Sequence, residues 1–218
     1  MSLPFTVEQF LAVFAGYNQA VWPAQILLNA AALAAIFLAI RPGGQRGRII
    51  SALLGLLWIW MGVVYHWIYF SGINRAAYLF GALFVVQGLL ILYSGVFRGQ
   101  LTFSLRKGCP GIRGSMLMTY SLVVYPILGY FLGHVYPSAP TFGLPCPTTI
   151  FSLGLLLWVD PKPPKLLLVI PLLWVLVGST AAFSMGIWED LGLLAAAALT
   201  LAPMLPDKGT STASNPVH

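Results

Sequence analysis

The chain has 218 residues, of which 59% are hydrophobic and 7% are charged, and its formal net charge is +6. Soluble domains carry roughly 25% charged residues, so this composition excludes a soluble globular protein and predicts an integral membrane protein. The basic residues lie in short loops between apolar segments, which argues against a nucleic-acid partner and predicts that they orient the chain in the membrane.

A short amphipathic helix is expected first, over residues 6–18. Thr6 and Gln9 have the spacing of a capping box, and apolar residues follow at helical spacing. A helix of this length cannot cross a bilayer. Residues 1–21 are therefore predicted to form an N-terminal interfacial amphipathic helix that lies flat on the membrane.

Seven apolar segments follow, and each is expected to cross the membrane as a helix. They cover about residues 22–40, 49–70, 76–97, 115–135, 142–159, 166–186 and 191–205. The predicted fold class is an all-α polytopic membrane protein, with a seven-helix transmembrane domain over residues 22–205. Residues 206–218 are polar and are expected to form a disordered cytoplasmic tail.

Seven crossings place the two ends of the chain on opposite sides of the membrane. Of the 11 Lys and Arg residues, only Arg75 then falls on the N-terminal side. Positive residues favour the cytoplasm, so the N-terminus is predicted outside and the C-terminus inside. This topology separates Cys109 from Cys146 by the ~30 Å of the bilayer, whereas a disulfide needs Cα atoms within about 7 Å. The two cysteines are predicted to stay unpaired.

The fifth segment opens on Cys146 between two prolines, followed by Thr148 and Thr149. A short helix with a proline-broken start has backbone groups that lipid cannot satisfy, so it should lie against other helices. Its positive end would point at an anionic or thiophilic ligand. The structural alternatives are that Cys146 is a small apolar residue at a rigid turn and that the two threonines cap the helix.

The residues whose side chains could bind a ligand or take part in chemistry gather on the predicted outer side of the membrane. The candidate ligand-binding residues are His66, Arg75, His134, Cys146, Thr148, Thr149, Glu189 and Asp190. Two histidines near the outer ends of their helices could ligate a metal ion or haem iron, with Cys146 as a further metal ligand. The alternatives are interfacial histidines that bond to neighbours or water, and acidic residues that pair with Arg75. The chain has no local zinc signature and no nucleotide-binding loop.

Glutamines and glycines inside the segments indicate helix packing. Gln25, Asn29 and Gln87 are expected to form hydrogen bonds between helices, and Gly81, Gly88 and Gly178 are expected to allow close helix contact.

Several blocks of sequence together carry a family resemblance. These are Pro-Phe-Thr-Val-Glu-Gln-Phe at the N-terminus, Tyr65-His66-Trp67, Phe80 to Phe84 with Gln87-Gly88, the Pro-Cys-Pro-Thr-Thr motif from Pro145, and Glu189-Asp190-Leu-Gly. The chain resembles a family of uncharacterised bacterial multi-pass membrane proteins over most of residues 3–195. The resemblance implies that the protein lies in the bacterial inner membrane, and it indicates no activity.

The leading hypothesis is an inner-membrane protein whose outward-facing polar pocket binds or transports a small solute or ion. Interrupted spans often mark transporter sites, and the absence of nucleotide motifs means that transport would be passive or ion-coupled. One alternative is a membrane-bound metal or haem protein, an oxidoreductase or hydrolase, that uses His66 and His134. Another is a non-catalytic subunit or assembly factor. The expected partners are the lipid bilayer and the solute, with a homo-oligomer or membrane complex possible and no nucleic acid.

Overall fold

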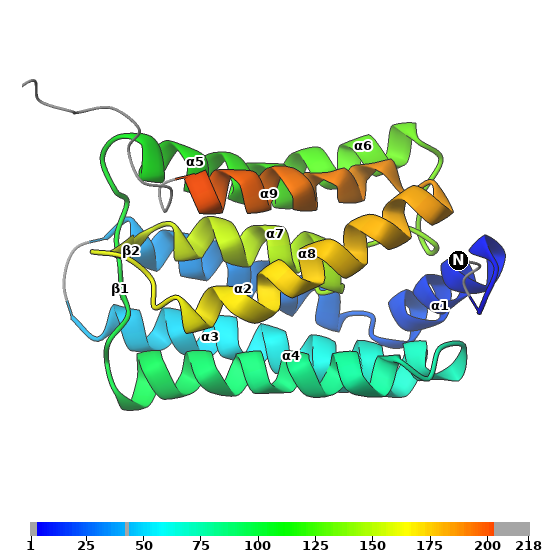
Figure 1. Ribbon diagram of the computed structural model, residues 1–218, viewed down its shortest axis with the longest axis horizontal. Helices are drawn as coiled ribbons and strands as arrows, with labels where there is room; N and C mark the ends of the chain where they lie inside the picture. The colour runs from blue at the N-terminus through cyan, green and yellow to red at the C-terminus, as the bar shows by residue number, and fades with distance from the viewer. Residues whose placement is uncertain (1–3, 42–43, 203–218) are drawn as a thin grey trace, which may run out of the picture.

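The computed structural model describes residues 4–41 and 44–202. The molecule is an elongated bundle in which the helices run alongside one another, while α1 lies across one end (Figure 1). The predicted disordered tail, residues 206–218, and the last residues of the seventh apolar segment lie outside the described residues.

The helices occur close to the predicted segments, and two short strands that the sequence did not predict occur between them. The first half of the chain forms α1 (Val7–Ala20), α2 (Ala24–Ala39), α3 (Arg46–Trp60), α4 (Ala77–Ile91) and strand β1 (Thr102–Phe103). The second half forms α5 (Cys109–Thr119), α6 (Tyr125–Phe131), α7 (Pro145–Leu156), strand β2 (Val159–Asp160), α8 (Leu166–Met185) and α9 (Gly192–Leu201). The all-α class is confirmed.

Three of the long helical rods contain π-helical stretches. Met61–Tyr69 continues α3, Leu92–Phe97 continues α4, and Tyr120–Val124 joins α5 to α6. The last of these precedes Pro126, which cannot donate a helical hydrogen bond.

The outside of the bundle is apolar. Large hydrophobic side chains such as Leu33, Leu56, Leu89 and Leu176 are exposed along their helices. By length and composition, four helical rods could cross a membrane, or five if α1 and α2 count as one broken span. These two helices meet at 87°. An exposed apolar belt of this extent fits a membrane protein.

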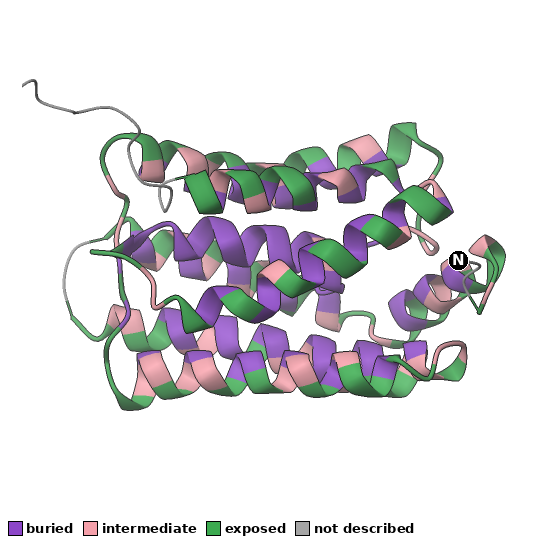
Figure 2. Cartoon of the chain, viewed as in Figure 1, coloured by how far each residue is buried: buried purple, intermediate pink, exposed green. Residues whose placement is uncertain are grey.

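Helix α7 is the centre of the bundle. Every residue from Pro145 to Leu156 is buried except Cys146, which is half-buried (Figure 2). The helix packs against α5, α8 and α9. The expectation that the fifth segment lies against other helices is confirmed.

Glycines allow the closest helix contacts. A methyl group added at Gly154 of α7 would lie 2.9 Å from the carbonyl oxygen of Gly114 in α5. One added at Gly88 of α4 would lie 2.6 Å from the carbonyl oxygen of Gly55 in α3. Neither distance leaves room for a side chain, so these backbones touch directly, as expected for Gly88.

The two ends of the bundle differ in charge. Strands β1 and β2 pair antiparallel and bring the two basic loops around residues 98–108 and 157–165 together, with Arg106 3.9 Å from Asp160. Arg41 and Arg48 lie around one space with Thr102 and Phe103 of strand β1. These basic loops therefore share one end of the bundle, and α1 lies at the other (Figure 1).

We predict that Gly154→Ala lowers the free energy of unfolding in detergent by about 1–3 kcal/mol, because overpacking pushes α5 from α7. Gly16→Ala is the matched control, since a methyl group there has no neighbour within 4 Å. Equal stability of the two variants would contradict a direct backbone contact at Gly154.

Candidate functional site

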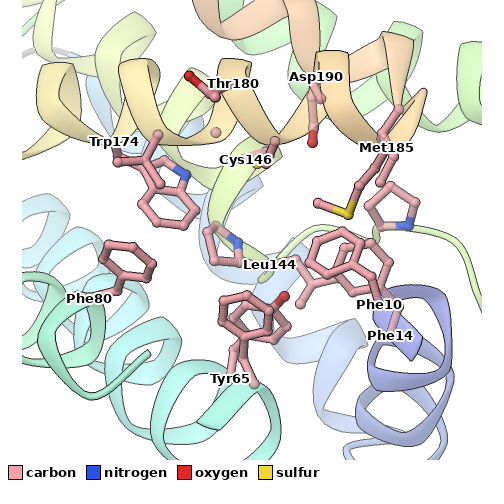
Figure 3. A pocket seen from close by; sticks show the side chains of 18 of the residues that line it. Phe10, Phe14, Tyr65, Phe80, Leu144, Cys146, Trp174, Thr180, Met185 and Asp190 are labelled. Atoms are coloured by element: carbon pink, nitrogen blue, oxygen red, sulfur yellow. The ribbon is translucent and has the colours of Figure 1, made fainter. Parts of the chain in front are cut away.

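A cavity of about 410 Å³ lies at the α1 end of the bundle, where α7 begins (Figure 3). Its walls come from α1, the π-helical end of the α3 rod, the start of α4, the start of α7, and α8. The Pro-Cys-Pro sequence from Pro145 forms part of the wall. The segment that the sequence marks as unusual therefore contributes directly to this cavity.

Aromatic side chains form most of the wall. Those that line the cavity are Phe5, Phe10, Phe14, Tyr65, Phe70, Phe80 and Trp174. Phe10 and Phe14 are one helical turn apart on α1, and their rings lie 4.6 Å from each other. This part of α1 is fixed in place because the predicted capping box of Thr6 and Gln9 forms and starts the helix.

Asp190 provides the acidic group of the cavity. Gly186 ends α8 in the left-handed conformation, and a 3₁₀ turn over Trp188–Leu191 then aims the Asp190 side chain inward (Figure 3). The side chain is only 4% exposed. The Tyr125 hydroxyl donates a hydrogen bond to the carboxyl group, and the Cys146 thiol donates another.

Burial raises the pKa of Asp190 to about 7, although the hydrogen bonds from Tyr125 and Cys146 oppose this shift. The nearby Glu189 carboxyl raises the pKa further. The group therefore exchanges its proton near neutral pH and can be either a neutral donor or an anion in the cavity.

Glu189 points to a different place and has a partner within the chain. Its Oε1 lies 2.7 Å from Nδ1 of His134, and both side chains are largely buried. The Tyr120 hydroxyl donates to the backbone oxygen of Glu189 at 2.7 Å. This group joins the turn before α9 to the ends of α5 and α6, so its observed contacts are structural.

His66 is not part of an outer polar group. Its imidazole is completely buried among aromatic rings, with centroids 4.7 Å from Phe84 and 5.2 Å from Trp174. Neither ring nitrogen has a hydrogen-bond partner among residues 4–41 and 44–202. His134 instead pairs with Glu189, so the two histidines have separate surroundings.

The metal hypothesis gains no support from this arrangement. In the part of the chain that the structure describes, no group of three or more His, Cys, Asp and Glu side chains could hold a metal ion. Both Cys109 and Cys146 are free thiols, which confirms that they do not pair.

The remaining candidate ligand-binding residues do not line the cavity either. The Thr148 hydroxyl accepts a hydrogen bond from the Gly143 amide at 2.9 Å, while Thr149 is buried with an unpartnered hydroxyl in the described chain. Arg75 is exposed and forms no ion pair with Glu189 or Asp190. Of the eight candidates, Cys146 and Asp190 line the cavity together.

Sequence reasoning did not identify the aromatic wall or Tyr125. Phe10 and Phe14 were recognisable as the apolar face of a helix, and Tyr65 and Phe80 belong to blocks that carry the family resemblance, but nothing in the sequence linked them. Tyr125 carries no local signal, because its role depends on α6 packing beside the 3₁₀ turn.

Comparison with known proteins gives a family and no activity. A family model described as "Family of unknown function (DUF6064)" matches residues 7–215. No curated protein and no solved structure matches the chain.

We predict that His134→Ala lowers the free energy of unfolding by about 3–5 kcal/mol, because it leaves the buried Glu189 carboxyl without its partner. In a Glu189→Gln background the same substitution should cost less than about 1 kcal/mol, since an uncharged amide tolerates the loss better. Chemical unfolding in detergent measures both. Equal losses in the two backgrounds would show that the pair is not coupled.

Proposed function

We propose that this chain, which belongs to the family of unknown function DUF6064, is an integral membrane protein that binds a small, largely apolar molecule in the cavity at the start of α7. The observation that carries the proposal is the cavity itself. Its volume of about 410 Å³ suits a small-molecule ligand, since such sites measure roughly 300–1,000 Å³. Its wall is apolar with a few converging polar groups, as in many ligand sites.

Access from the bilayer supports an apolar ligand. Leu176 and Thr180 of α8 line the cavity and are also exposed on the outside of the bundle. In a membrane, this side of α8 would face lipid. A molecule dissolved in the acyl chains could therefore enter between α8 and α1 without crossing the polar surface.

The proposal includes a full membrane topology. We propose that seven helical segments, from α2 to α9, cross the bacterial inner membrane, with the N-terminus outside and the C-terminus in the cytoplasm. The shared basic end of the bundle supports this orientation, because basic loops favour the cytoplasm. Movement of the bound molecule across the membrane would make the protein a passive or ion-coupled transporter.

Two probes of the same shape test ligand binding. They are benzyltrimethylammonium and its uncharged carbon analogue, neopentylbenzene. We expect at least one to bind the purified protein. Ala181→Trp, which fills the cavity from α8, should weaken that binding by about tenfold or more, which corresponds to ~1.4 kcal/mol. Ala198→Trp, on an exposed face of α9, is the matched control. Binding of neither probe, or equal binding to both variants, would contradict the proposal.

Labelling with a membrane-impermeant maleimide tests the topology. In a Cys146→Ala background, the exposed Cys109 should react only after cells are permeabilised, because its loop is proposed to be cytoplasmic. With Cys109 also replaced, a cysteine at the exposed position 75, Arg75→Cys, should react in intact cells. The reverse pattern would invert the orientation, and labelling of both sites from outside would show that the α4 rod between them does not cross the membrane.

A further inference from the structure

We infer that the ligand of this cavity is an organic cation with an apolar body, whose positive charge lies against Asp190 and the aromatic wall. The inference rests on the proposed function, because it names the class of molecule that the cavity would bind. Three features of the described residues support it: a buried carboxyl group without a cationic partner, aromatic rings around the space that it faces, and an opening on the apolar side of the bundle.

The first feature is the missing countercharge. No lysine, arginine or histidine in the described ranges forms an ion pair with Asp190, and the nearby His134 is already paired with Glu189. The titratable groups around Asp190 are otherwise neutral donors or acids, namely Tyr65, Tyr120, Tyr125, Cys146 and Glu189. Ionising a carboxyl group in such a place costs free energy unless a cation binds beside it. The protein therefore leaves one position open for a positive charge.

The second feature is the aromatic wall. Tyr65, Phe80 and Trp174 line the cavity that Asp190 also lines (Figure 3), and the faces of aromatic rings carry negative electrostatic potential. A cation near such a face is attracted to it, and the attraction is stronger when water is excluded. An anionic ligand would meet both these faces and the Asp190 carboxylate, so the wall selects against it.

The start of α7 does not reverse this preference. A helix N-terminus attracts anions through its free N–H groups, but Pro145 and Pro147 have none. The amide of Thr148 already donates to the carbonyl oxygen of Leu144 at 3.3 Å. The expected anion-binding end of this helix is thus depleted of donors on the cavity side.

Cation binding and proton binding should compete at Asp190. When the carboxyl is protonated, the cation has no countercharge, so binding releases one proton: AspH + L⁺ → Asp⁻·L⁺ + H⁺. Because burial raises the pKa of Asp190 to about 7, the exchange falls in the physiological range. Affinity for a cation should be constant well above pH 7 and should fall by about tenfold per pH unit below it. A neutral ligand should show no such dependence.

The experiment compares benzyltrimethylammonium with neopentylbenzene on the full-length protein in detergent, by equilibrium dialysis from pH 5.5 to 8.5. We expect wild-type protein to bind the cation with the stated pH dependence. Asp190→Asn should weaken cation binding by about tenfold or more and change binding of the neutral analogue by less than about twofold. Asp160→Asn, at the exposed basic end, is the matched control and should change neither.

The possible outcomes separate the inference from the proposed function. If the neutral analogue binds in the cavity and the cation does not, the ligand class is overturned while the binding function stands. Cation binding that does not vary with pH and is equal in Asp190→Asn also overturns it. If Asp190→Asn does not fold, the pH profile of the wild-type protein decides, since a flat profile excludes Asp190 as the countercharge. If neither probe binds, the proposed function itself fails.

Discussion

The enclosure of α7 is the constraint on which the rest of the structure depends. This helix has 12 residues, which span ~18 Å at ~1.5 Å per residue, well short of the ~30 Å hydrocarbon layer. Several of its polar groups have partners on neighbouring helices, although the Thr149 hydroxyl has none among the described residues. Ser121 donates to the backbone oxygen of Pro147 at 2.6 Å, and the Trp58 indole donates to Ser152 at 3.0 Å. Lipid offers no such partners, so α7 requires a complete ring of helices.

A short central helix also leaves space at its end, and the fold fills that space only in part. Helix α1 turns by 87° from α2 and covers the opening from outside. A hydrogen-bond network fixes this corner, because Gln25 and Thr141 both donate to the Asn18 amide oxygen, at 2.6 and 2.7 Å. The remaining volume is the cavity. Helix α1 is therefore a packed wall of the site, in addition to being the amphipathic helix that the sequence predicts.

Local signals were predictable from the sequence, and relations between distant segments were not. The capping box of Thr6 and Gln9, the unpaired cysteines and the burial of the fifth segment follow from short-range chemistry and are confirmed. The position of His66 was harder to predict. It lies within the π-helical stretch Met61–Tyr69, where the i→i+5 bonding pattern changes which face a side chain presents. His66 lies among aromatic rings, while His134 contacts Glu189, and neither contact was apparent from the sequence. Seven crossings were expected from hydropathy, whereas the length and composition of the helices support four or five. The two numbers differ in part because α7 and α9 are too short to count as membrane-spanning helices by length.

Glu189 and Asp190 are adjacent in one 3₁₀ turn, but their carboxyl groups have different surroundings and, we infer, different roles. Adjacent residues in a 3₁₀ turn point about a third of a turn apart, so the two carboxyls reach different environments. Oε1 of the Glu189 carboxyl meets a histidine that belongs to the chain. Asp190 meets a hydroxyl, a thiol and a cavity, none of which supplies a positive charge. A buried carboxyl that the fold leaves uncompensated is stabilised either by a proton or by a bound cation. The difference between these neighbours is therefore the reason to regard the first as part of the scaffold and the second as the group that recognises a ligand.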